Sequence, residues 1–90
     1  MSLTIRQSGR FRRDIKRLKR QRADLAKLET VIRHLVAQET LAKRYHDHYL
    51  VGNWKGFREC HIQPDWLLIY RIEDKELQLA RTGSHAQLFR

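Results

Sequence analysis

Apolar residues recur every three or four positions in two stretches of the first half of the chain. The first stripe holds Phe11, Ile15 and Leu18, and the second holds Leu25, Leu28, Val31, Ile32 and Leu35. This period matches the turn of an α-helix and predicts two amphipathic helices. Ser8 and Asp24 precede the two stripes, where their side chains can accept hydrogen bonds from free helix amides. The short polar link between the stripes predicts an antiparallel helical hairpin.

The second half changes to runs that are rich in β-branched and aromatic residues. These runs predict strands over residues 56–62, 66–72 and 76–81, and residues 3–5 predict a further short strand at the N-terminus. Gln63-Pro64-Asp65 and Glu73-Asp74-Lys75 separate the later strands and are typical of tight turns. Tight turns join antiparallel neighbours, so the three later strands should form a meander.

These elements predict an α+β fold in one domain over residues 1–90. The two helices should cover one face of an antiparallel sheet of about four strands, because each apolar stripe must be buried. Residues 40–53 show no clear period and are expected to form a loop. Ser84 can cap a short C-terminal helix that carries His85, Leu88 and Phe89.

Charge is unevenly distributed along the 90 residues. The formal net charge is +9, and residues 1–44 hold thirteen Lys or Arg against four Asp or Glu, whereas residues 45–90 hold six of each. A segregated basic half suits a polyanion such as nucleic acid, or an acidic protein partner. The alternative is a solvated helical face that has no partner. The candidate RNA- or ribosome-binding residues all lie on the first predicted helix: Arg12, Arg13, Lys16, Arg17, Lys19 and Arg20.

Cysteine content and hydropathy limit the compartment. Cys60 is the single cysteine, so no internal disulfide can form, and a reducing cytoplasm is expected. The longest apolar run covers residues 66–70, far fewer than the roughly 20 residues that a membrane-spanning helix needs. No membrane association is expected.

Candidate chemistry gathers in the charge-neutral half. Histidines at positions 46, 48, 61 and 85 lie in predicted loops, at strand ends or at a helix start, and such positions tend to converge at one side of a small sheet. The predicted hairpin should bring His61 close to Asp65. Arg81 continues an apolar strand face, so its guanidinium must reach water or meet an anion. His34 lies alone on the second predicted helix and is interpreted as a surface histidine.

Three interpretations of the histidines compete. A metal site would use two or three of them with Asp65 or Cys60, but the chain has no second cysteine and no His-Glu-x-x-His motif. A structural interpretation makes them packing or capping residues. The third is cleavage of RNA without metal, in which imidazoles deprotonate the 2′-hydroxyl and protonate the leaving 5′-oxygen while Arg81 holds the phosphate. Aromatic residues could stack on unpaired bases; the candidates are Tyr45, Tyr49, Trp54, Phe57 and Trp66.

The second half also carries a family resemblance. Residues 52–70 read Gly-Asn-Trp-Lys-Gly-Phe-Arg-Glu-Cys-His-Ile-Gln-Pro-Asp-Trp-Leu-Leu-Ile-Tyr and residues 81–85 read Arg-Thr-Gly-Ser-His. Together with His48 and Phe89, these runs closely resemble the YafQ-like toxins of the RelE superfamily, which belong to bacterial type II toxin–antitoxin systems. The match covers residues 45–90, and the N-terminal helices match in pattern and basic character.

The resemblance implies a RelE-like microbial ribonuclease fold and an mRNA interferase that cleaves mRNA on the ribosome and needs no cofactor. It also implies inhibition by a DinJ-like antitoxin, with operator DNA bound only through the antitoxin complex. The family's catalytic set falls on His48, His61, Asp65 and His85, with Arg81 at the phosphate and Phe89 near the substrate.

Roles within this set follow from residue chemistry. His85 is the candidate general acid, and His61, Asp65 or His48 is the candidate base. Two other function classes remain open: a nucleic-acid-binding module without catalysis, and an interaction protein whose basic face holds an acidic partner.

Overall fold

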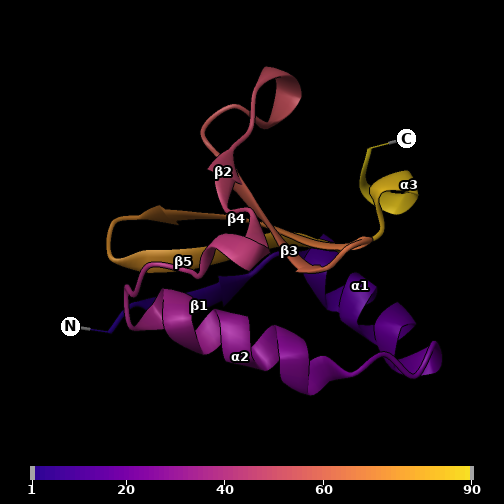
Figure 1. The fold of residues 1–90 in the computed structure, drawn as a ribbon. Coiled ribbons are helices and arrows are strands. Elements are labelled where there is room, and N and C mark those ends of the chain that lie inside the picture. Colours follow the sequence, from indigo (N-terminus) through magenta and orange to yellow (C-terminus); the bar gives the residue numbers. More distant parts are fainter. Residues whose placement is uncertain (1, 90) are drawn as a thin grey trace.

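The computed structural model describes residues 2–89 and places two helices beneath a twisted sheet (Figure 1). The elements follow in the order β1 (Thr4–Gln7), α1 (Gly9–Arg20), α2 (Leu25–Val36), the 3₁₀ turn η1 (Lys43–Tyr45), β2 (His48–Tyr49), the 3₁₀ turn η2 (Gly52–Trp54), β3 (Arg58–Gln63), β4 (Trp66–Glu73), β5 (Glu76–Gly83) and α3 (His85–Leu88).

Both predicted helices and both predicted caps are confirmed. The Ser8 hydroxyl accepts a hydrogen bond from the Phe11 amide, and the Asp24 carboxylate accepts one from the Ala26 amide. Because each side chain satisfies an amide that has no partner within its helix, the helices begin where the sequence indicates. The hairpin that they form covers one face of the sheet (Figure 1).

The sheet has five strands in the order β1-β5-β4-β3-β2, and it is mixed. The expectation of about four antiparallel strands is therefore corrected in two ways. β1 pairs parallel to β5, because the helical hairpin intervenes between β1 and the meander. The predicted loop contains β2, which pairs with β3 through His48 and Tyr49. A strand of two residues is too short to show an alternating pattern.

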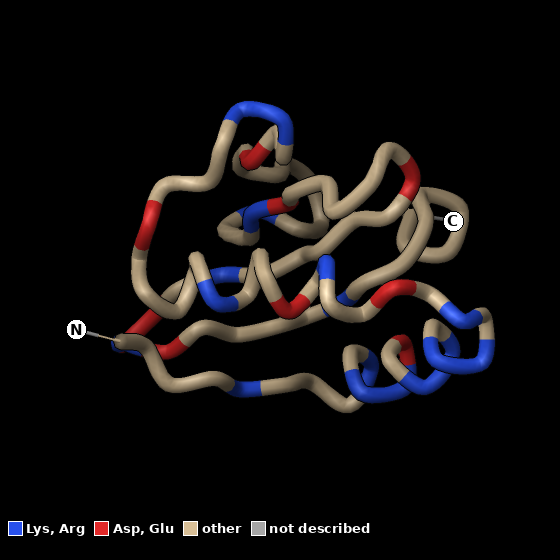
Figure 2. Tube along the Cα trace, turned by 60° about the horizontal axis from the view of Figure 1, so that its bottom comes forward, with Lys and Arg blue, Asp and Glu red and all other residues tan. Residues whose placement is uncertain are grey.

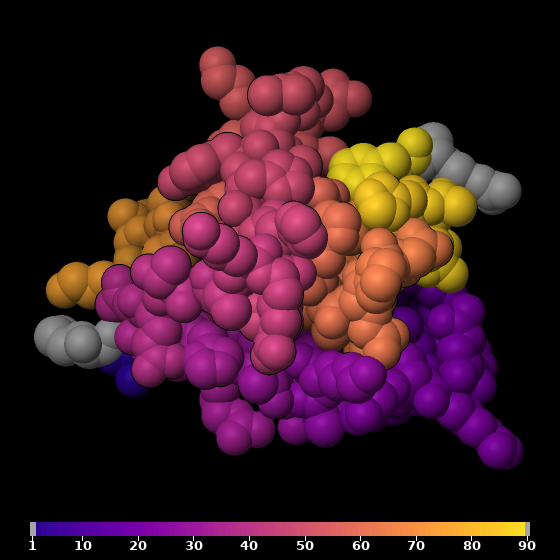
Figure 3. Space-filling view, in the orientation of Figure 1, coloured from indigo at the N-terminus to yellow at the C-terminus, as the bar shows by residue number. Residues whose placement is uncertain are grey.

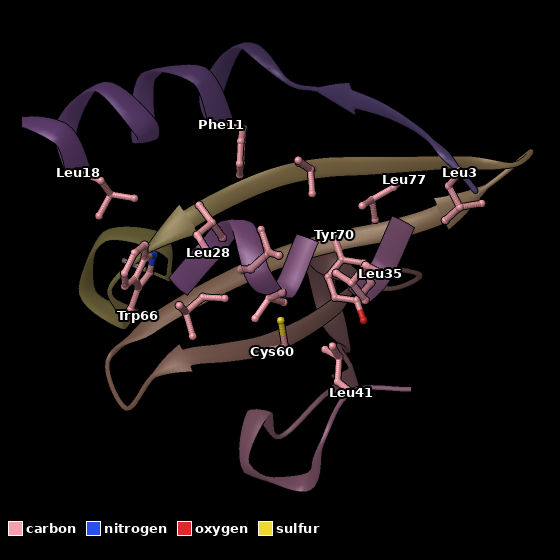
Figure 4. Close-up of a cluster of buried hydrophobic side chains, with 14 residues drawn as sticks. Leu3, Phe11, Leu18, Leu28, Leu35, Leu41, Cys60, Trp66, Tyr70 and Leu77 are labelled. Atoms are coloured by element: carbon pink, nitrogen blue, oxygen red, sulfur yellow. The ribbon is translucent and has the colours of Figure 1, made fainter. Parts of the chain in front are cut away.

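The main core lies between the helices and the sheet (Figure 4). Phe11, Leu28 and Leu35 from the helices meet Leu77 and Tyr70 from the sheet, and all five are at most 3% exposed. The neighbouring Cys60 is fully buried, and burial raises the pKa of its thiol to about 12. Cys60 is therefore a packing residue, since the reactive thiolate does not form at neutral pH.

A second, smaller cluster lies on the opposite face of the sheet. Leu67 and Ile69 project there from β4 and meet Leu88 of α3, with Trp54 and Phe57 packed against them. Residues 50–57 and α3 thus cover part of the face that the helices do not reach. Within residues 2–89, no helix combines the length and the apolar character that crossing a membrane would require.

Candidate functional site

Strand register places Glu59 and His61 on the sheet face opposite the helices. Glu59 pairs with Ile69 and His61 pairs with Leu67, and both partners belong to the smaller apolar cluster. Residues two apart on a strand share a face, so Glu59 and His61 project together. Glu59 is 5% exposed, which places an ionisable carboxyl group in a largely buried position beside the histidines.

His48 contacts Glu59 from β2. Its Nε2 lies 3.2 Å from Glu59 Oε2, and its Nδ1 donates to the carbonyl oxygen of His46 at 2.6 Å. His61 Nε2 lies 3.7 Å from the same Glu59 oxygen. Both ring nitrogens of His48 therefore face oxygen atoms. Each contact can be a hydrogen bond if both ring nitrogens carry a proton, or if Glu59 carries the proton that lies between it and Nε2. Glu59 joins the two imidazoles.

Asp65 holds His85 at the start of α3. Asp65 Oδ1 accepts from the His85 backbone amide at 3.1 Å and lies 3.0 Å from His85 Nδ1. The hydrogen bonds from His85 lower the pKa of Asp65 below its ordinary value, so the carboxylate stays ionised at neutral pH. Because Nδ1 faces Asp65, Nε2 is the ring nitrogen that can exchange a proton with a substrate.

The junction of β5 and α3 is tightly built. Ser84 and Gln87 form a capping box around the first turn of α3. Gly83 has φ +153°, and a Cβ there would lie 2.7 Å from Gln87 Oε1 and 2.8 Å from Arg17 Nη2. A side chain at this φ would be strained and would displace the ends of Gln87 and Arg17, so Gly83 helps to fix the position from which His85 projects.

Four rings form a continuous row across the site, which we call the ring row: His46, His61, His85 and Phe89. Successive ring centroids lie 5.4, 5.8 and 6.3 Å apart. The prediction that histidines far apart in the sequence gather at one side of the sheet is therefore confirmed. Phe89 is 43% exposed, which leaves its ring accessible beside His85.

Two contacts within the cluster go beyond the prediction. Asp65 was expected to lie close to His61 across the turn, and its hydrogen bonds go to His85. Glu59, which joins His48 to His61, was not predicted. One signal was present in the sequence, because Glu59 stands two positions before His61 on a predicted strand and so shares its face.

The guanidinium of Arg81 was expected to reach water or to meet an anion, and in the structure it meets Asp14 of α1. The guanidinium donates from Nε to Asp14 Oδ2 at 2.8 Å and from Nη2 to Oδ1 at 3.0 Å. Asp14 also accepts from the Thr82 amide at 3.1 Å and forms an ion pair with Arg17 at 3.0 Å. Among residues 2–89, Arg81 Nη1 has no hydrogen-bond partner.

Trp66 has a supporting position. Its side chain is buried, and its Nε1 donates to Thr82 Oγ1 at 2.9 Å, while that hydroxyl donates to the Leu67 carbonyl. The substrate contact predicted for Trp66 does not fit this burial. The indole instead fixes the end of β5, three residues before His85, because a buried ring with a satisfied N–H group is not free to stack on a base.

The basic residues of α1 divide into two groups. Arg12, Lys16 and Lys19 are exposed. Figure 2 shows Lys and Arg, in blue, recurring along this helix. Arg17 is half-buried and donates from Nη2 to the Thr82 carbonyl at 3.3 Å. A depression of about 370 Å³ surrounds Asp14, and its other lining residues are Arg10, Arg13, Arg17, Arg20 and Arg81. The predicted cation stripe thus forms, but Arg17 belongs to the support of β5.

Across residues 2–89, no group of three or more His, Cys, Asp or Glu side chains is arranged to hold a metal ion. Glu59 contacts both His48 and His61. What the cluster offers is acid–base chemistry: imidazoles that carry protons, oriented by two carboxylates.

A basic helical hairpin on a small mixed sheet, with histidines and carboxylates gathered at one side, defines a RelE-like toxin. The family model described as "Bacterial toxin of type II toxin-antitoxin system, YafQ" matches residues 3–90. The chain belongs to the YafQ toxin family.

Individual relatives agree with this assignment. The "mRNA interferase toxin YafQ" of Escherichia coli strain K12 is 42% identical over 86 residues, which cover 94% of each chain. The E. coli DinJ-YafQ toxin–antitoxin complex contains a chain with TM-score 0.91 and 40% identity, with full coverage of both chains. A copper-bound mutant toxin from Helicobacter pylori has TM-score 0.93 and 42% identity, and the match covers 97% of this chain and 99% of that one.

Proposed function

We propose that this protein is the toxin of a type II toxin–antitoxin system and cleaves mRNA on the ribosome, without a metal ion in the chemical step. The observation that carries the proposal is the 5.8 Å approach of His61 and His85, each beside a carboxyl group. Two imidazoles at one place can remove one proton and deliver another, which is what transesterification of RNA needs.

The proposed roles follow from the contacts. His85, oriented by Asp65 through Nδ1, protonates the leaving 5′-oxygen from Nε2. The His48–Glu59–His61 group removes the proton from the 2′-hydroxyl, which then attacks the adjacent phosphorus atom. Arg81 can offer its free Nη1 to the phosphoryl oxygens while Asp14 holds the rest of its guanidinium. Phe89 provides an exposed ring for a base beside His85.

The nature of the RNA ends tests this mechanism. Attack by the 2′-hydroxyl leaves a 2′,3′-cyclic phosphate on the upstream fragment and a 5′-hydroxyl on the downstream fragment. Mapping the ends of mRNA that has been cut on purified ribosomes should find both groups. Intact mRNA would support binding without catalysis, whereas a 3′-hydroxyl paired with a 5′-phosphate would indicate attack by water.

The proposed partners follow from charge and family. A DinJ-like antitoxin would neutralise the toxin, and operator DNA would be bound only through the antitoxin complex. The toxin would act in the cytoplasm, where ribosomes present dense phosphate to the basic face of α1.

Replacing Arg12, Lys16 and Lys19 with serine should weaken ribosome association and reduce its salt dependence. Log affinity falls as log salt concentration rises, and each lost phosphate contact makes this negative slope shallower by somewhat under one. The three side chains are exposed, so the fold should be unaffected. Binding to ribosomes, measured over a range of KCl concentrations, gives the slope.

Replacing Arg33, Lys55 and Lys75, which are exposed outside α1, with serine provides the matched control. An equal fall in the slope for this variant would show that net charge alone is responsible. An unchanged slope for the α1 variant would assign its cations to the antitoxin.

A further inference from the structure

We propose that a groove beside the ring row binds a nucleotide next to the cleaved linkage, with its base stacked on Arg44 and Tyr45. This inference rests on the proposed RNA cleavage and adds a binding site to it. The groove has a volume of about 1030 Å³, enough for a nucleotide. Its substrate class is single-stranded RNA, whose unpaired bases are free to stack.

The groove is continuous with the histidine cluster. Its lining includes His46, His48 and His61, together with Lys27 and Thr30 of α2. In Figure 3 these parts face the viewer, with α2 below and the orange β3–β4 turn to one side. An RNA strand that places a phosphodiester at the histidines must therefore place a neighbouring nucleotide in or beside this groove.

An open strand edge contributes to the groove. β2 pairs with β3 only through His48 and Tyr49, opposite Glu59 and Arg58. Within residues 2–89 no strand pairs with β3 beyond Glu59 on that side, although η1 packs against β3, and His61, Ile62 and Gln63 all line the groove. Backbone groups at a free strand edge can form hydrogen bonds with a ligand. The groove therefore offers polar contacts as well as a wall for packing.

The stacking surface is already assembled. The half-buried Tyr45 packs against the main core, and the guanidinium carbon of Arg44 lies 5.0 Å from the centroid of its ring. Arg44 Nη2 also donates to the Tyr45 hydroxyl at 3.1 Å. The core covers part of the tyrosine ring while Arg44 is exposed, so a base can extend the stack over the guanidinium plane.

The charge of the groove fits a phosphodiester. Lys27 and Arg44 are both exposed, and no residue that lines the groove is Asp or Glu. The arginine-lined depression on α1 differs in this respect, because its lining includes Asp14, which binds Arg81. Cations without an acidic partner attract a backbone phosphate, so the phosphate of the bound nucleotide should lie near Lys27 and Arg44.

Removing one base from the mRNA tests the site. Two ribosome-bound mRNAs would carry an abasic nucleotide on the upstream or the downstream side of the cleaved linkage. At one of these positions, we expect the abasic nucleotide to slow single-turnover cleavage by the unaltered protein about tenfold, the value of one stacked base. In Tyr45→Ala, intact and abasic mRNAs should be cleaved at the same, lowered rate.

Tyr49→Ala is the matched control. Tyr49 is also a tyrosine with an arginine over its ring, since the guanidinium carbon of Arg58 lies 5.2 Å from its centroid, but it does not line the groove. This variant should keep the tenfold difference between intact and abasic mRNA. A tenfold difference that survives in Tyr45→Ala would overturn the proposal, as would an unaltered protein that is indifferent to both abasic positions.

A second pair of variants covers the possibility that Tyr45→Ala does not fold. Arg44→Ser removes an exposed side chain and should also abolish the abasic effect, whereas Lys43→Ser, at the adjacent exposed position outside the groove, should retain it. Equal behaviour of these two variants would contradict the assignment. Failure of the unaltered protein to cleave intact mRNA would instead overturn the proposed function, and the groove site with it.

Discussion

Replacing His85 with alanine is expected to slow cleavage of ribosome-bound mRNA by about 10²- to 10⁴-fold, the contribution of one general acid or base. His85 is exposed at the start of α3, and Asp65 holds its Nδ1 at 3.0 Å so that Nε2 can reach a substrate. The variant loses the proton donor for the leaving oxygen. Single-turnover cleavage, with the protein in excess over ribosomes, measures this step directly.

His34→Ala is the control for this substitution. His34 is also an exposed histidine beside a carboxylate, with Nδ1 2.6 Å from Glu39 Oε1, but it lies on α2 outside the ring row. Its variant should cleave at the unaltered rate. Circular dichroism should be unchanged in both variants, because neither side chain is buried. Full cleavage by His85→Ala would remove His85 from the mechanism.

The sequence predicted the elements whose apolar pattern repeats over several helical turns or several strand residues. The stripes of α1 and α2 are long enough to show their period, and Ser8 and Asp24 act locally, so both helices and their caps could be placed. The meander followed from its two tight turns. β2 escaped prediction because two residues show no alternation, and the pairing of β1 with β5 depends on contacts more than 70 positions apart.

The sequence predicted which histidines gather at the site but not which carboxylate contacts which imidazole. Histidines at loops and strand ends indicated where the chemistry would gather, and their rings do meet. Which carboxylate meets which imidazole depends on register and on the course of α3, so Asp65 pairs with His85 and Glu59 with His48. Both outcomes require three-dimensional placement to within an ångström or so.

The pairing of Arg81 with Asp14 could not be predicted from the apolar period of the sequence. Asp14 lies three positions after Phe11 and four before Leu18, on the stripe that α1 buries, although a carboxylate is a poor core residue. The spacing of Asp14 fits the buried face, and the guanidinium of Arg81 was expected to reach water or to meet an anion. Neither observation alone joined them, because the two residues are 67 positions apart in the sequence.

Replacing Asp14 with alanine is expected to lower the free energy of unfolding by about 3–5 kcal/mol, the usual effect of leaving a buried charge without its partner. Asp14 is 2% exposed, and it receives hydrogen bonds from Arg81 and from the Thr82 amide. Its loss leaves Arg81 uncompensated and frees the end of β5. Urea unfolding followed by tryptophan fluorescence measures the change.

The double variant Asp14→Leu/Arg81→Met separates ion pairing from packing. Replacing both charges with apolar side chains leaves no buried charge, so it should destabilise the protein less than Asp14→Leu alone. If the double variant lost as much stability as the two single variants combined, the Asp14–Arg81 pair would contribute nothing of its own. Both measurements use the full chain at neutral pH.

Acid should remove the stability that the ionised Asp14 side chain contributes, as the alanine substitution does. Burial alone would raise the pKa of its carboxyl group, but hydrogen bonds from Arg81 and Thr82 and the charges of Arg81 and Arg17 outweigh it and hold the pKa below the ordinary value of 3.8. Stability from Asp14 is therefore complete above that value and declines as pH falls through the lower pKa of the folded protein. Urea midpoints measured from pH 6 downward should fall more steeply for the unaltered protein than for Asp14→Ala. Parallel curves would show that other carboxylates govern acid unfolding.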